Sequence, residues 1–283
     1  MLAAVAVFSV MDALIKLLSE HYPPFQVAFL RGAASLPFTL LPVAVRRRFA
    51  RLKWVNGKLH VLRGLLSIAM LGGFVQAVHS SSLAATYSIF MFAPLLVAAL
   101  SAPLLGEAVV RAQWVAIAVG LGGVLLMVRP GSGDFAVSGA LWAVIAMLTY
   151  SLSVVTLRLL SRTDTTESMV FWFPALLSCG AGLIALPGWV ELRFADATLI
   201  IALGVVAAIA QQLITIAFRS APAAVVAPFE YTALIWGVCL DVAIWNVWPQ
   251  LVTVLGGGIV IGAGLYLVAR ERRQSRAAAI QQA

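Results

Sequence analysis

The chain alternates between long apolar stretches and short polar ones from its first residue to about residue 269. An uncharged apolar run of about 18 or more residues is long enough to cross a hydrocarbon core of about 30 Å as a helix. Such runs lie at 135–157, 168–190, 197–218 and 242–269. The pattern therefore predicts an all-α polytopic membrane protein, in which each helix pairs its own backbone polar groups.

The same pattern predicts ten transmembrane helices. The run from 64 to 106 carries no charged residue and is too long for one crossing, and the polar stretch His79–Ser82 divides it into two helices. The predicted spans are 2–18, 24–44, 59–78, 83–105, 113–128, 137–158, 168–187, 197–218, 221–244 and 248–268. Because the remaining loops are too short for a soluble domain, any function must lie within or between the helices.

Two short matches predict that the chain is a duplication. Lys16–Glu20 at the end of the first helix resembles Arg158–Arg162 at the end of the sixth, and 79–84 resembles 219–224 at the turn between the third and fourth helix of each half. We therefore expect two five-helix repeats, residues 1–130 and 136–271, followed by a basic cytoplasmic tail at 272–283.

A repeat with an odd number of spans is followed by its copy upside down in the bilayer. Such inverted repeats recur in secondary transporters, where the two halves open a shared midplane site to either side in turn. The 5+5 arrangement thus predicts transport by alternating access. An ancient duplication without a transport role is the alternative reading.

Charge sets the expected orientation. The chain is 62% hydrophobic and 11% charged, with a formal net charge of +8. Its Lys and Arg residues concentrate in the tail and in the loops on one side, above all at 46–58, whereas the opposite loops carry only Arg129 and Arg193. Basic loops stay in the cytoplasm, so both termini are expected there. This distribution explains the basic charge without nucleic acid, and Trp54 beside the basic run is expected at the membrane interface.

The chain resembles the drug/metabolite transporter superfamily, and within it the EamA-type transporters. The resemblance covers nearly the whole chain and rests on the ten-helix duplication, on Val27–Arg31, on Leu105–Glu107 and on Gly120–Val124. The second half departs from the pattern, because Phe173 stands where the repeat would place a second arginine. The subgroup that it resembles most implies a bacterial inner (plasma) membrane exporter of aromatic amino acids and related small amphipathic metabolites.

Charged residues deep in a span are candidates for function because each costs about 2.5–3.5 kcal/mol even on lenient insertion scales. Four such residues are Asp12, Lys16, Arg31 and Glu230. Asp12 and Arg31 are expected at nearly the same depth, and Asp12 and Lys16 are spaced i,i+4 on one helix face. Either basic residue paired with Asp12 would tie helices together, and the alternative is direct contact with substrate. Glu230 has no basic residue in its own span, so it is a candidate for binding an amine or exchanging a proton.

Uncharged polar and aromatic side chains extend the set of substrate-binding or coupling candidates. Amides bind zwitterions but also join helices, and a histidine at a loop is more often solvated than a proton relay. Aromatic rings stack on substrates but more often pack in the core or against lipid. The additional candidates are Gln76, His79, Tyr87, Phe90, Tyr150, Gln211, Gln212, Tyr231 and Trp236. Arg63 is expected to reach the cytoplasmic interface rather than to act in the site.

The sequence also argues against other classes of protein. It has no nucleotide-binding Gly-x4-Gly-Lys motif, no metal-ligand spacing around Cys179 or Cys239, and no hydrolase motif, so no cofactor, metal or enzymatic activity is expected. A membrane enzyme acting on lipid and a channel remain the alternatives. Gly258 and Gly262 fit packing against the fifth helix or against another copy of the chain, so a homo-oligomer stays open.

Overall fold

The computed structural model describes residues 1–105, 137–220, 229–230 and 232–252, with some residues between 115–126 and between 254–269. Five helical segments are long and apolar enough to cross a membrane by length and composition: 24–45, 57–80, 138–160, 166–188 and 194–220. They correspond to five of the predicted spans, 24–44, 59–78, 137–158, 168–187 and 197–218. Most of the predicted helix at 113–128 and parts of the last two spans lie outside the described residues, so the count of ten stays a prediction.

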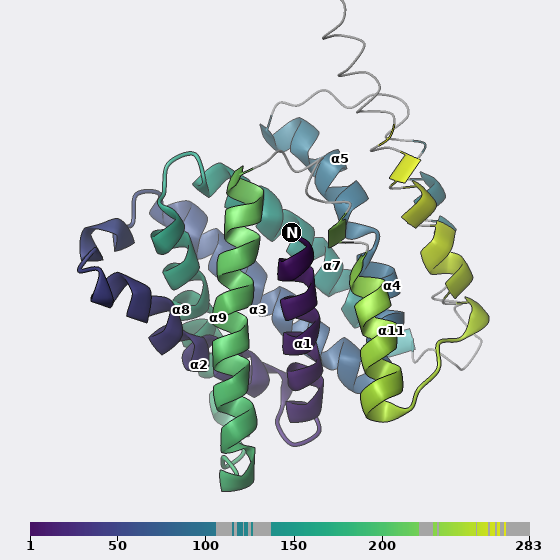
Figure 1. Ribbon diagram of the computed structural model, residues 1–283, viewed down its shortest axis with the longest axis horizontal. Coiled ribbons are helices and arrows are strands. Elements are labelled where there is room, and N and C mark those ends of the chain that lie inside the picture. Colours follow the sequence, from purple (N-terminus) through teal and green to yellow (C-terminus); the bar gives the residue numbers. More distant parts are fainter. Residues whose placement is uncertain are drawn as a thin grey trace, which may run out of the picture.

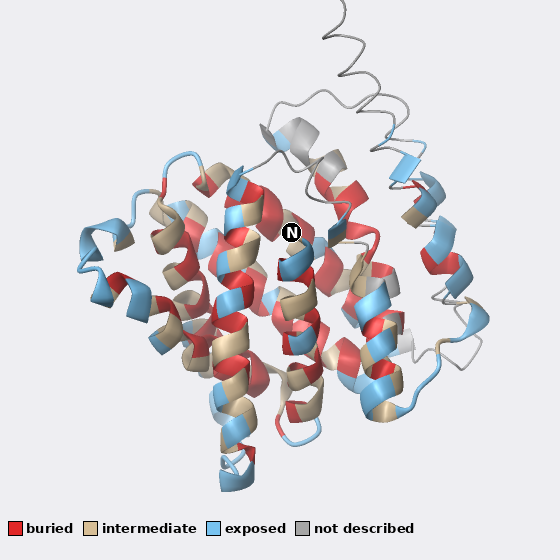
Figure 2. Ribbon diagram, in the orientation of Figure 1, coloured by how far each residue is buried: buried red, intermediate tan, exposed pale blue. Residues whose placement is uncertain are grey.

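The helices pack side by side, with a buried face on each turned toward its neighbours (Figures 1 and 2). Their bounds are α1 Leu2–Leu18, α2 Pro24–Val45, α3 Gly57–Ser80, α4 Leu83–Phe90, α5 Ala93–Leu105, α7 Val137–Leu160, α8 Thr166–Ala185, α9 Ala197–Ser220 and α11 Thr232–Trp245. Short 3₁₀ turns lie at Phe49–Leu52, Leu186–Gly188 and Phe194–Asp196.

The span predicted at 83–105 is two helices rather than one. α4 ends at Phe90, and α5 begins at Ala93 after a turn at Met91 and Phe92. Pro94 has no N–H to donate to the carbonyl of Phe90, four residues earlier, so the regular helix is interrupted there. Irregular backbone at membrane depth is tolerated where it is buried in protein, and both Met91 and Phe92 are buried.

Packing joins helices that are far apart in sequence. α2 packs along α8, α3 along α7 and α8, and α9 along α1 and α2, while α11 contacts α1 and α4. Gly32 permits the approach of α2 to α8, since a Cβ there would lie 2.8 Å from the backbone oxygen of Pro174. Small residues allow such close contact between membrane helices, where lipid offers no hydrophobic drive for association.

The loop after α2 is bound to the beginning of α8. The backbone oxygens of Leu52 and Lys53 accept hydrogen bonds from Trp172 Nε1 at 2.9 Å and Ser168 Oγ at 3.2 Å. The Trp54 ring stacks on Trp172 with centroids 4.7 Å apart. The loop expected to be only a basic anchor with an interfacial tryptophan is therefore also an ordered contact between the two predicted halves.

Candidate functional site

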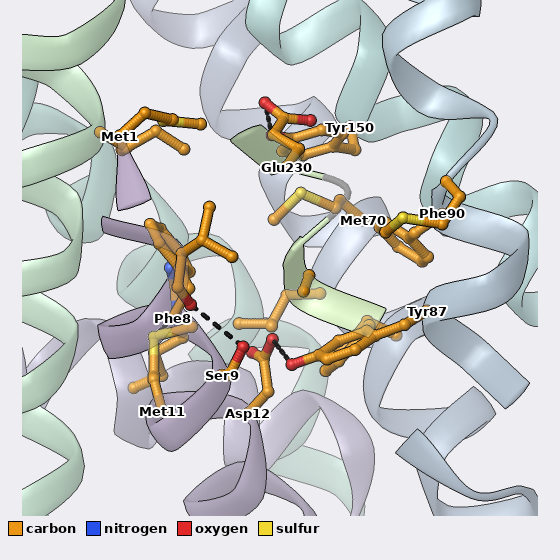
Figure 3. Close-up of a pocket in the computed structure, with 17 residues that line it drawn as sticks. Met1, Phe8, Ser9, Met11, Asp12, Met70, Tyr87, Phe90, Tyr150 and Glu230 are labelled. Carbon is orange, nitrogen blue, oxygen red and sulfur yellow. Dashed lines mark hydrogen bonds between the residues drawn. The ribbon is translucent and has the colours of Figure 1, made fainter. Parts of the chain in front are cut away.

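A cavity of about 130 Å³ lies between helices from both ends of the chain. Most of its lining is apolar, and its polar side chains are few (Figure 3). It is lined by Met1, Val5, Phe8, Ser9, Met11, Asp12, Arg31, Met70, Leu71, Phe74, Tyr87, Phe90, Met91, Tyr150, Ile214, Glu230 and Ala233. An apolar pocket with a few convergent polar groups is the usual form of a small-molecule site.

Two carboxylates of the cavity each accept a hydrogen bond from a tyrosine. Tyr87 Oη donates to Asp12 Oδ2 at 2.7 Å, and Tyr150 Oη donates to Glu230 Oε1 at 3.1 Å. Figure 3 shows the two pairs on opposite sides of the group of lining residues. Each pair joins separate helical segments, and a carboxylate held by one hydroxyl keeps further acceptor capacity for a ligand.

Asp12 and Arg31 line the same cavity, as their predicted depths implied. They are not, however, an ion pair within 4.0 Å among the residues that the structure describes. Arg31 Nε instead donates to Met11 Sδ at 3.3 Å, and its guanidinium carbon lies 5.4 Å from the centroid of the Phe173 ring. The Asp12–Arg31 tie allowed by the sequence is therefore not formed as a direct contact.

Lys16 lies outside the cavity lining and has a different partner from the one that its i,i+4 spacing suggested. Its Nζ lies 3.0 Å from Asp241 Oδ1 and 4.1 Å from the centroid of the Trp245 ring. The Asp12–Lys16 pair that the spacing permitted is therefore not formed. Asp241 was missed as a candidate although it is a charged residue inside the predicted span 221–244, and a charge within a span is the signal that found the other four.

The remaining aromatic candidates divide into two groups. Tyr87, Phe90 and Tyr150 line the cavity, and Phe90 packs on both Phe74 and Tyr150 with ring centroids 5.6 and 6.0 Å away. Trp236 is 42% exposed and is not part of the lining. Tyr231 lies outside the described residues.

The polar candidates also differ in place. Gln211 is buried, lines a second cavity, and donates from Nε2 to Thr215 Oγ1 at 3.3 Å. Gln212 and His79 are exposed, and Gln76 is half-buried. None of these last three lines either of the two cavities described.

Arg63 is the main functional candidate that sequence reasoning placed wrongly. It was expected to reach the interface, yet it is 5% exposed and lies in the second cavity, of about 50 Å³. Its guanidinium carbon lies 4.6 Å from the centroid of the Phe173 ring. The sequence signal that could have identified it is the presence of an arginine inside the predicted apolar span 59–78.

Comparisons with known proteins show similarity to membrane transporters. Residues 1–129 match the model of the EamA-like transporter family. This part of the chain is therefore similar to that family. The matched range contains the Arg31 and Glu107 motifs on which the resemblance rests.

Full-length relatives are also transporters. The chain is 29% identical over 268 residues to the pseudopaline exporter CntI of Pseudomonas aeruginosa, covering 92% of this chain and 91% of the relative. It is 26% identical to an S-adenosylmethionine uptake transporter of Rickettsia prowazekii, with 94% and 90% covered, and 25% identical to a riboflavin transporter of Rhizobium johnstonii, with 97% and 91% covered. The comparisons therefore point to a multi-pass membrane transporter of small molecules and not to an enzyme. They do not name an aromatic amino acid among these substrates.

A solved crystal structure of another protein has the same fold. It superimposes with a TM-score of 0.69 over 96% of this chain and 98% of that chain, at 19% sequence identity. At this identity the similarity concerns the fold alone.

Proposed function

We propose that this chain is a secondary transporter that exports small amphipathic metabolites, with aromatic amino acids as its substrates, by alternating access. The observation that carries the proposal is the cavity, which takes most of its lining from α1, α2, α3 and α4 and the rest from α7, α9, α11 and Glu230. A site shared by both predicted repeats is the arrangement that alternating access requires.

The packing of the helices supports an inverted repeat of residues 1–130 and 136–271. If α1 corresponds to α7, α2 to α8 and α3 to α9, the contact of α3 with α7 has its counterpart in the contact of α9 with α1. The contact of α3 with α8 likewise corresponds to that of α9 with α2, and α2 meets its own counterpart α8. This exchange of partners is what a two-fold relation between the halves would produce.

The two tyrosine–carboxylate pairs support the same relation. Asp12 and Tyr87 come from the first and fourth predicted spans of the first half, and Tyr150 and Glu230 from the first and fourth of the second. In the first half the first span supplies the acid and the fourth span supplies the phenol, and in the second half this order is reversed. Asp12 and Glu230 are thus placed to bind the substrate amine alternately or to exchange protons, while Phe74 and Phe90 offer ring faces to an aromatic side chain.

The location completes the proposal. We place the protein in a bacterial inner membrane with both termini in the cytoplasm, because the basic residues lie on that side. Cysteine labelling from each side of intact cells tests this orientation. Residues 46–58 and the carboxyl tail must label from the same, cytoplasmic, side.

Flux measurements on proteoliposomes that contain only this protein test the transport activity. Saturable, stereoselective movement of labelled L-phenylalanine, L-tyrosine or L-tryptophan would support both the class of protein and the substrate. Saturable flux of other metabolites from a labelled panel would keep the transporter and replace the substrate. Non-saturable ion conductance would favour a channel instead, and chemical turnover of added lipid would favour an enzyme.

A further inference from the structure

The second cavity contains two buried arginines that face a shared aromatic ring. It is lined by Phe8, Arg31, Arg63, Met70, Tyr150, Ser153, Val154, Leu157, Phe173, Gln211, Ile214 and Phe218. Arg31 and Arg63 are 3% and 5% exposed, and both guanidinium carbons lie within 5.4 Å of the Phe173 centroid. The two charges are therefore within about 10 Å of each other, where they repel across a low-dielectric interior.

Neither arginine has its charge balanced by direct contact. Within the described part of the chain, no carboxylate lies within 4.0 Å of either guanidinium group. Arg63 makes one long hydrogen bond, from Nη1 to the backbone oxygen of Met169 at 3.4 Å, and its buried Nε has no partner in that part of the chain. Since a guanidinium group has five N–H donors and does not lose its proton in proteins, most of this donor capacity is unused.

A buried cation without a counterion is costly, and an oxyanion placed between the two arginines would offset that cost. Guanidinium groups match carboxylates in particular, because two parallel N–H groups reach both oxygens. Ser153 and Gln211 add a hydroxyl and an amide to the same lining. The ring of Phe173 keeps the two guanidinium groups in place without competing for the anion, because an aromatic face attracts the cation and offers no acceptor oxygen.

The second cavity is next to the main one and shares part of its lining. Phe8, Arg31, Met70, Tyr150 and Ile214 belong to both. A molecule in the main cavity can therefore extend one end past Arg31 toward Arg63. Its other end then lies among the aromatic rings, near the carboxylates of Asp12 and Glu230.

We infer that the cavity around Arg31 and Arg63 is a carboxylate-binding subsite, which holds the acid end of the transported molecule while the main cavity holds its apolar body. The inference rests on the proposed transport function and deepens it by naming an anionic group that the substrate must carry. It also assigns Arg63, together with Ser153 and Gln211, to substrate binding.

Benzoate and its neutral isostere benzamide test the subsite directly on detergent-purified protein. Thermal unfolding followed by light scattering measures their binding, because a ligand that binds the folded state raises Tm. We expect benzoate to raise Tm. Benzamide should bind with an affinity at least about ten-fold lower and should therefore raise Tm less. Equal effects of the two probes would overturn the inference.

Variants of Arg63 locate the effect. Arg63→Gln should weaken benzoate binding about ten-fold or more, and Arg63→Lys should retain part of it, since lysine keeps the charge but loses the planar fork. Arg51→Gln is the matched control, because Arg51 is an exposed arginine paired with Glu167 on the surface. Unchanged benzoate binding in Arg63→Gln contradicts the inference. If that variant does not fold, Arg63→Lys and Ser153→Ala give the same comparison with smaller changes.

Flux in proteoliposomes separates this inference from the transport proposal. The wild type should carry L-phenylalanine and exclude L-phenylalaninamide, and Arg63→Lys should reduce that preference. Arg63-dependent benzoate binding without flux of any solute would leave the subsite standing and defeat transport. Flux that does not distinguish acid from amide would leave transport standing and defeat the subsite.

Discussion

Asp241 on α11 is bound to two other helices through one oxygen atom. Its Oδ1 lies 3.0 Å from Lys16 Nζ on α1 and accepts a hydrogen bond from the backbone N–H of Leu83 at 3.2 Å, at the first residue of α4. The side chains of Asp241 and Lys16 are 1% and 12% exposed. This carboxylate therefore fixes the approach of α11 to the beginning of α4.

Asp241→Asn should destabilise the protein strongly, because it leaves the largely buried ammonium group of Lys16 without this counterion. Breaking one side of a buried ion pair costs about 3–5 kcal/mol. Glu167→Gln is the matched control: its partner Arg51 is half exposed, and such surface pairs contribute about 0–1 kcal/mol. Thermal unfolding in detergent measures both variants. A loss of stability in Glu167→Gln as large as in Asp241→Asn would contradict this account.

Asp12→Asn should reduce transport more than it reduces stability. The amide oxygen of asparagine still accepts the hydrogen bond of Tyr87, so the fold keeps this contact. The negative charge that we propose as the partner of the substrate amine is lost. Tyr87→Phe is the complementary variant, and it should cost about 0.5–1.5 kcal/mol of stability for the lost hydrogen bond. Flux and unfolding are measured on the same preparations. Wild-type flux in a well-folded Asp12→Asn protein would exclude Asp12 from the mechanism.

Glu230→Gln should alter the pH dependence of flux. A carboxyl group that exchanges a proton or binds an amine acts differently once it is a permanently neutral amide. Initial rates in proteoliposomes between pH 5.5 and 8.5 give the two profiles, with the exposed Glu20→Gln as control. If flux is independent of pH and the variant transports like the wild type, Glu230 has neither role.

Acid should weaken the contact between the loop after α2 and the beginning of α8 through Asp164. Burial of this carboxyl opposes its ionisation, but hydrogen bonds from His60, Thr163 and the backbone N–H of Val55 outweigh burial and hold its pKa below the usual value. Because the pKa of Asp164 is lower in the folded state than in the unfolded state, the ionised carboxylate stabilises the fold. This contribution to the free energy of unfolding is complete above the unfolded pKa of about 4 and is lost as the pH falls below it.

Tm measured from pH 7 down to pH 3 should therefore fall at the acid end for the wild type. Asp164→Asn should start from a lower Tm at pH 7 and show a flatter acid limb, because it has no proton to gain. Fluorescence of the stacked Trp54 and Trp172 reports the local change. Parallel acid limbs in the two proteins would rule out Asp164 as the group responsible.

Gly32→Ala should destabilise the packing of α2 on α8. The added Cβ would lie 2.8 Å from Pro174 O and 2.9 Å from the backbone nitrogen of Ser178, neither of which moves without shifting the helix. Overpacking of this kind costs roughly 1–3 kcal/mol. Gly122→Ala is the control, since no atom of the described residues lies within 4 Å of a Cβ there. Equal unfolding temperatures for the two variants would contradict the close approach.

The helices were largely predictable because their length follows from the thickness of a bilayer. The predicted spans 24–44, 59–78 and 197–218 differ from α2, α3 and α9 by no more than about two residues at either end. The break at Met91 was not predicted, although Pro94 was a visible cause, because an apolar run by itself does not show where a helix ends.

The site was predictable in its parts and not in its pairing. Asp12, Arg31, Tyr87, Tyr150 and Glu230 do share one cavity. Local spacing suggested Lys16 as a partner for Asp12, but the true partner of Lys16 lies 225 positions away, where only the folded chain can bring it. Arg63 was misplaced for a related reason, since its depth depends on how α3 packs against α7 and α8 rather than on its distance from the end of its own span.

The hydrogen bonds of residues 51–55 to the beginning of α8 limit how the transporter can move. This stretch continues from α2 by covalent bonds, yet its backbone is fastened to the opposite half. If the two bundles rock against each other as rigid bodies, the strain falls on the few residues between Val45 and Arg51. Arg47 in this stretch already has a φ of 49°, a left-handed backbone conformation that residues other than glycine rarely adopt, so the link that would have to bend is itself conformationally restricted.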